Sequence, residues 1–220
     1  MKSLMRLKCN TFTLKTASVF VFIGLSTLFS CKKTSFNNEK ELHEYVSSLS
    51  KKSETDLYTV TVKYLPAEYL TYKELKGKSY STNEKDSLQR VYNTSRAFII
   101  NIRLKDDRLD PLKENSAGYT EYKNKLEALA FDMESFVTVE ADSIEFLPVL
   151  SMLHPTQNLG GGKSVYLLFA DNEKQSGLLK ADHLNLIFKD EIFSTGSHKF
   201  NFSKKDLNDI PNIAFWKPTE

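Results

Sequence analysis

The segment AFIINIRLK at residues 97–105 strongly constrains the fold of this chain, because apolar residues occupy nearly every second position. A period of two places alternate side chains on opposite faces of an extended strand, so one face is buried and the other is more polar. Such a strand requires a sheet whose apolar face is covered by another layer. The apolar face of the predicted strand consists of Phe98, Ile100, Ile102 and Leu104.

Similar alternation predicts further strands, most of them after residue 135. One strand is expected at 56–65, and two short strands are expected on either side of the turn EADS. Three more strands are expected at 165–170, 183–190 and 198–203. Helical spacing of apolar residues predicts helices near 39–50, 66–74, 84–95 and 119–133, with Asn38 as an N-cap and Ser81 and Glu84 as a capping box. The sequence therefore predicts an α+β fold with an antiparallel β-sheet or sandwich. We expect it to be strand-rich in the C-terminal half, with several amphipathic helices mainly in the N-terminal half.

The first 31 residues have the layout of a secretory signal peptide. Basic residues occur up to Lys15, an apolar run covers 17–29, and Ser30 and Cys31 follow. That run is shorter than the ~20 residues that a membrane-spanning helix needs. The tetrapeptide LFSC, which runs from Leu28 to Cys31, resembles the lipobox of bacterial lipoproteins.

This resemblance implies that the chain is cut before Cys31 and that the Cys31 sulfur and the new N-terminus are acylated. The alternatives are an ordinary signal peptide with a chance cysteine, or an uncleaved signal anchor. We predict a cleaved signal peptide at 1–30, an acylated cysteine and tether at 31–38, and a single globular domain at 39–220. In the lipoprotein family an aspartate after the cysteine favours inner-membrane retention. Lys32 therefore points to the outer membrane of the cell envelope, with the periplasmic and surface faces both open.

Cleavage changes the charge and the cysteine content of the chain. The precursor has a formal net charge of +2, but residues 1–30 hold four basic and no acidic residues, which leaves the mature chain at net −2. A near-neutral domain lacks the basic footprint of nucleic-acid-binding proteins, so no nucleic acid partner is expected. Cys9 leaves with the signal peptide and Cys31 carries lipid, so the mature domain has no thiol chemistry.

The segment NLGGGKS at 158–164 invites comparison with a phosphate-binding loop. That loop requires a glycine where this chain has Gln157, and a helix where it has the β-forming run VYLLFA. Nucleotide binding is therefore not expected. The segment is predicted to connect two antiparallel strands, with Lys163 as a possible contact for a partner.

Residue types that carry chemistry are present but are not arranged in a known motif. The histidines show no metal-ligand spacing, so neither a metal nor a cofactor is expected. Gly196, Ser197 and His198 are better explained by a tight turn than by a nucleophile and its base. The acidic pairs Asp106–Asp107, Glu140/Asp142 and Asp190–Glu191 could serve sugar hydrolysis or calcium, and also suit turns. The histidines are His43, His154, His183 and His198.

Aromatic residues remain as candidate contacts. Tyr72 and Trp216 could stack on a sugar or anchor a partner protein, although packing at the edge of the core is the alternative. The leading hypothesis is a non-enzymatic envelope lipoprotein that acts as an assembly or protein-interaction factor. A glycan- or peptide-binding lipoprotein is the second hypothesis, and a periplasmic or surface hydrolase is the third.

Overall fold

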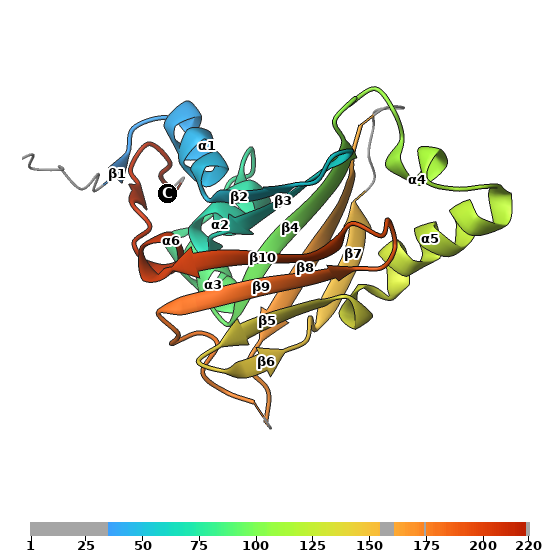
Figure 1. Cartoon of the computed structure of the whole chain (residues 1–220). Coiled ribbons are helices and arrows are strands. Elements are labelled where there is room, and N and C mark those ends of the chain that lie inside the picture. The colour runs from blue at the N-terminus through green and yellow to red at the C-terminus, as the bar shows by residue number, and fades with distance from the viewer. Residues whose placement is uncertain (1–34, 155–160, 174, 219–220) are drawn as a thin grey trace, which may run out of the picture. The chain divides into compact units, whose positions relative to one another are not determined.

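The computed structural model describes residues 35–154, 161–173 and 175–218. These residues belong to one compact unit, shown in Figure 1. The predicted signal peptide and Cys31 lie outside the described residues. Within the described part of the chain, no helix is long and apolar enough to cross a membrane.

Two antiparallel sheets form the body of the fold, which confirms the predicted α+β class. The five-stranded sheet has the order β2-β3-β4-β8-β7, and the four-stranded sheet has the order β10-β9-β5-β6. The first sheet comprises β2 (Ser50–Glu54), β3 (Tyr58–Leu65), β4 (Ser95–Leu104), β8 (Lys163–Ala170) and β7 (Leu150–His154). The second comprises β10 (Gly196–Ser203), β9 (His183–Asp190), β5 (Val137–Ala141) and β6 (Ile144–Phe146).

The main core lies between these two sheets. β4 buries the apolar face that its period-two pattern predicts. The residues of β3 and β8 on the same side of the sheet are also buried, against β5, β9 and β10. Phe98 is 0% exposed, and its ring contacts Tyr64, Phe169 and Phe202 at centroid distances of 5.4, 5.9 and 5.2 Å. Because Phe202 belongs to β10, Phe98 joins the two sheets directly.

The four predicted helices are present and begin within two residues of their expected starts, whereas α4 and α6 were not predicted. They are α1 (Glu39–Ser48), α2 (Ala67–Leu75), α3 (Thr82–Tyr92), α4 (Pro111–Glu114), α5 (Tyr119–Phe131), the 3-10 helix η1 (Met133–Ser135) and α6 (Lys204–Asn208). The Asn38 side chain accepts a hydrogen bond from the Glu41 amide at 2.9 Å, as expected for an N-cap. Ser81 and Glu84 form the predicted capping box, which lowers the pKa of Glu84 because its carboxylate accepts hydrogen bonds from Ser81.

A second apolar cluster covers one end of the outer face of the five-stranded sheet. It contains Leu42 and Val46 of α1, Leu65, Ala97 and the C-terminal segment around β11 (Asn212–Ile213). Figure 1 shows α1, α2 and α3 gathered at this end of the strands and α4 at the other. The pocket described below lies on the rest of that outer face, and among the described residues only strand residues line it.

The predicted tether is too long at its C-terminal end. Ser35 and Phe36, expected within the polar segment 31–38, form β1 (Ser35–Phe36), which pairs in parallel with β11. Phe36 is fully buried in the second apolar cluster. A buried phenylalanine removes far more apolar surface from water than a tether residue would, so Ser35 and Phe36 belong to the folded domain instead of the tether.

Candidate functional site

A polar row crosses the outer face of the five-stranded sheet. Paired residues in neighbouring strands project to the same side of a sheet. The register therefore places one side chain from each strand in a line, in the order Lys52, Thr61, Asn101, Ser164 and His154. The row joins residues from both halves of the chain, and the Asn101 amide donates to the Ser164 hydroxyl at 2.9 Å.

Two basic side chains lie on either side of this row. Lys63 follows Thr61 by two residues on β3, and Arg103 follows Asn101 by two residues on β4. Since β3 and β4 are antiparallel, the two cations lie in opposite directions from the row, roughly 13 Å apart along the strands. The resulting pocket has a volume of about 450 Å³ and is lined by Ser50, Thr61, Lys63, Ile99, Asn101, Arg103, His154 and Ser164.

The pocket has a positive electrostatic character. Its lining contains no carboxylate, and among the described residues no ion pair joins Lys63 or Arg103 to an acid. Arg103 acts at longer range on Glu54, whose pKa is lowered mainly by its contact with Lys52. Two unpaired cations and a row of hydroxyl and amide groups suit an anionic, hydrogen-bonding ligand.

The aromatic residues singled out in the sequence form a packed cluster instead of an open platform. Tyr72 is only 3% exposed, so its ring is not available to stack on a ligand. Trp216 is half-buried, and its ring lies 5.4 Å from Tyr72 and 4.7 Å from Tyr80. Lys85 places its ammonium group 5.0 Å from the Trp216 ring centroid. Tyr72 therefore packs within the second apolar cluster, and the half-buried Trp216 packs against it.

Lys163 is engaged within the chain. Its ammonium group forms an ion pair with Asp110 at 2.6 Å, and Asp110 also accepts a hydrogen bond from the Leu112 amide at the start of α4. The side chain joins the beginning of β8 to the N-cap of α4, so its ammonium group already has an internal partner. A strand follows the glycines, as predicted, while residues 155–160 lie outside the described residues.

Ser197 and His198 do not act as a pair, because neighbouring residues of β10 point to opposite faces. His198 instead contacts the Ser53 hydroxyl at 2.9 Å and the Thr195 hydroxyl at 2.8 Å, and Thr195 donates to Asp190. Burial lowers the pKa of His198, which favours the neutral ring. This chain of hydrogen bonds joins β2 to β10, which lie side by side in Figure 1, and supports a structural role.

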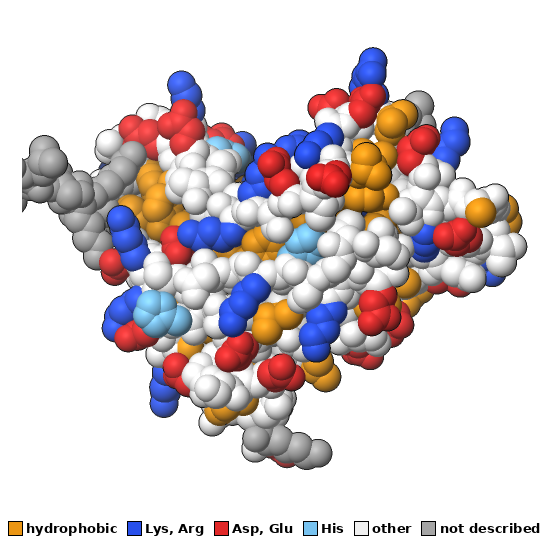
Figure 2. Space-filling view, in the orientation of Figure 1, with side chains coloured by type: hydrophobic (Ala, Val, Ile, Leu, Met, Phe, Trp, Pro, Cys, Tyr) orange, Lys and Arg blue, Asp and Glu red, His pale blue; other side chains and the backbone are white. Residues whose placement is uncertain are grey.

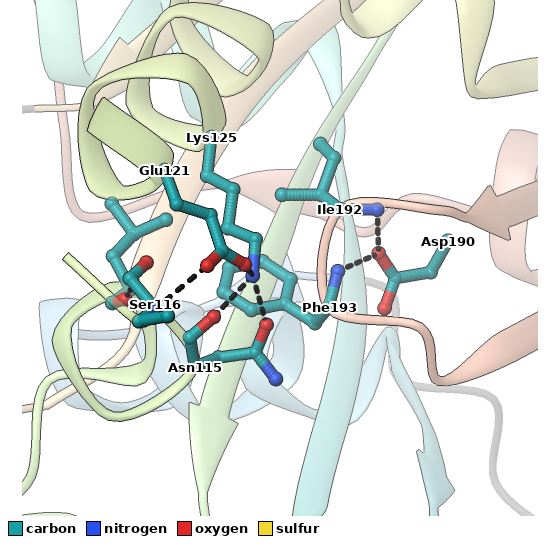
Figure 3. Close-up of polar contacts among 9 residues, drawn as sticks. Asn115, Ser116, Glu121, Lys125, Asp190, Ile192 and Phe193 are labelled. Atoms are coloured by element: carbon teal, nitrogen blue, oxygen red, sulfur yellow. Dashed lines mark hydrogen bonds and ion pairs between the residues drawn. The ribbon is translucent and has the colours of Figure 1, made fainter. Parts of the chain in front are cut away.

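A second depression, of about 330 Å³, lies between α5 and the turn after β9. Figure 3 shows two separate sets of polar contacts at and beside it, one around Lys125 and one around Asp190. Lys125 donates to Asn115 and forms an ion pair with Glu121 at 2.7 Å, while Asp190 accepts from the Ile192 and Phe193 amides at 3.1 and 3.0 Å. Because Lys125, the cation in its lining, already has partners, this depression offers less to an anionic ligand than the sheet-face pocket does.

The remaining titratable residues do not converge. His183 and His198 lie at opposite ends of the β9–β10 pair, where they face Ser203 and Phe188. Among the described residues, no group of three or more histidine, cysteine and acidic side chains is arranged to hold a metal ion. Basic and acidic side chains are interspersed over the face formed by β9 and β10 (Figure 2).

An apolar surface segment follows the core strands of the four-stranded sheet. Five large apolar side chains within nine residues are between 41% and 57% exposed. We call this group the β6–β7 apolar segment. It consists of Ile144, Leu147, Val149, Leu150 and Met152.

Comparisons with known proteins show no family for this chain. No family model matches it, and neither does any curated protein. Among solved structures it is similar to a protein of unknown function from Burkholderia pseudomallei K96243, with 10% sequence identity and a TM-score of 0.37. The match covers 77% of this chain and 90% of that chain. A likeness at this level carries no argument about function.

Proposed function

We propose that this protein is a lipid-anchored envelope lipoprotein that acts through contact with another protein. The lipobox-like sequence ending at Cys31 supports the anchor. The β6–β7 apolar segment supports the contact and is the observation that carries the proposal. An adjoining group of exposed apolar side chains is costly in water and is typical of a surface that is covered in an assembly.

The geometry of the segment favours a protein partner. Leu150 and Met152 belong to β7, which is an edge strand of the five-stranded sheet, and Ile144 belongs to β6, an edge strand of the other sheet. The segment therefore connects the edge strand of one sheet to the edge strand of the other. Natural proteins protect such edges with charged residues or with a covering element. Here Ile144, Leu150 and Met152 are exposed apolar residues on these edges, alongside the polar Glu145 and His154. The apolar residues suit an apolar protein surface as the occupant.

The anchor is tested by replacing Cys31. In Cys31→Ser the acceptor for the acyl chain is lost, so fatty-acid labelling should disappear and the protein should leave the membrane fraction. Each buried methylene contributes about 0.8 kcal/mol to membrane binding, so removing whole chains has an all-or-none effect. Cys9→Ser is the matched control and should label normally. Labelling that survives in Cys31→Ser would contradict the lipoprotein assignment.

The contact surface is tested by site-specific photo-crosslinking in intact cells. A photoreactive amino acid at Leu150 should yield a crosslinked adduct of defined mass, and a Met152→Lys change should reduce that adduct by about tenfold, because a lysine is costly to bury against an apolar surface. Val91 is a matched control, since it is a 63% exposed aliphatic residue on α3. The same adducts from positions 150 and 91, or none from position 150, would count against the proposed surface.

A further inference from the structure

We infer that the pocket on the outer face of the five-stranded sheet binds a small acidic sugar, that is, a polyhydroxylated molecule with a carboxylate or phosphate group. This inference is independent of the proposed protein contact. It rests on the polar row, the two cations beside it and the volume of the pocket.

The anionic group is assigned to the two cations. Lys63 is half-buried and Arg103 is exposed, and neither has an acidic partner among the described residues. The pocket wall also contains no carboxylate that would repel an anion. Arginine can bind a carboxylate or a phosphate through two parallel hydrogen bonds, and lysine adds a mobile point charge. Long side chains on opposite sides of the row can both reach a group that lies above it.

The hydroxyl groups of the ligand are assigned to the polar row. Thr61 and Ser164 can each donate and accept, Asn101 offers an amide, and His154 lies at the end of the row on β7. Asn101 already donates to Ser164, so the two side chains hold each other in position before a ligand arrives. Ile99 supplies an apolar floor that a sugar ring can cover.

The size of the pocket agrees with this class of ligand. Its volume of about 450 Å³ falls within the roughly 300–1,000 Å³ of typical small-molecule sites. An inorganic ion would fill only a small part of it, while a monosaccharide with an acidic group can occupy the row and reach a cation. The site is therefore expected to prefer such a sugar over inorganic phosphate alone.

The test is calorimetric titration of the purified full-length protein with four probes: glucuronate, glucose 6-phosphate, glucose and inorganic phosphate. At least one acidic sugar should bind about tenfold more tightly than both glucose and inorganic phosphate, and added salt should weaken that binding. Preference for glucuronate or for glucose 6-phosphate identifies the acidic group as carboxylate or phosphate. Equal binding of glucose, or binding of inorganic phosphate alone, would overturn the inference.

Variants of the cations show whether this pocket is the site. Arg103→Gln and Lys63→Met should each raise the Kd of the preferred acidic sugar by about tenfold, because each removes a charge-assisted hydrogen bond. Lys189→Met is the matched control, since Lys189 is an exposed strand lysine on β9 of the other sheet. Arg103 is exposed, so its replacement is expected to leave the fold intact. Equal weakening by Lys189→Met, or unchanged binding in both pocket variants, would also overturn the inference.

Discussion

Replacing Phe98 with alanine is expected to lower the free energy of unfolding by about 3–5 kcal/mol, the usual range for a buried phenylalanine. The Phe98 side chain is 0% exposed and lies between the two sheets. Its ring contacts one residue of β10 as well as neighbours in its own sheet. Alanine would leave a cavity that cannot close without moving one sheet toward the other, so the loss includes both transfer and cavity contributions.

The measurement is chemical denaturation followed by circular dichroism, and the chain offers a control of the same residue type. Phe131 at the end of α5 is 81% exposed, so Phe131→Ala should change the unfolding free energy by no more than about 0.5 kcal/mol. Equal losses in the two variants would mean that Phe98 does not have the central place in the core described above.

Replacing Gly162 with alanine is expected to lower the free energy of unfolding by about 1–3 kcal/mol, because the added methyl group crowds a packed region. A methyl group at this position would lie 2.6 Å from the Ile102 carbonyl oxygen and 2.9 Å from the Arg103 Cβ. The first contact is with backbone of β4, which cannot swing away as the end of a side chain can. The pairing of β8 with β4 would have to shift at its first residues.

Gly118 is the matched control for this substitution. It has an extended backbone, and a methyl group there would meet no heavy atom of the described chain within 4 Å. Gly118→Ala should therefore lower the free energy of unfolding by less than about 1 kcal/mol. That small loss is expected because Gly118 is the N-cap of α5, where alanine is less favourable than glycine. Thermal unfolding of both variants gives the comparison. A Gly162→Ala protein that melts like the unchanged chain would refute the close approach of β8 to β4.

The pocket and the β7 residues of the apolar segment, Leu150 and Met152, lie on the same face of the five-stranded sheet. Met152 pairs with Tyr166 and lies two residues before His154, so both β7 side chains project to the same side. A protein that covers Met152 would therefore lie close to the end of the polar row. Under the two proposals, occupation of the pocket could change the affinity for the partner, and the same variants serve to measure both.

Local signals in the sequence predicted most of the regular structure. The alternation in 97–105 and the caps at Asn38 and Ser81 were confirmed because each depends on residues a few positions apart. The strand β2 was not predicted, since its sequence SKKSE has no apolar alternation. It forms because its backbone pairs with β3, and its polar side chains are tolerated at a sheet edge.

The candidate site could not be predicted in the same way. Three residues of the polar row are far apart in the chain, namely Thr61, Asn101 and Ser164. In the sequence, each resembles any polar residue on the solvent-facing side of a strand. Conversely, Tyr72, Trp216 and Lys163 looked available because sequence does not show what packs beside them. Tyr80, Lys85 and Asp110 supply those contacts.

The sequence by itself determined the class of the fold, the order of most elements and the face that the strongly alternating strands bury, because these follow from the spacing of apolar residues over short distances. It also carried the lipobox-like segment at Cys31, which no tertiary contact is needed to recognise. Only the tertiary structure decided which strands pair and in what register. The register places Lys63 and Arg103 on either side of Asn101, and it brings polar residues from distant segments together to line one pocket. Side chains from distant segments meet only when their strands are aligned.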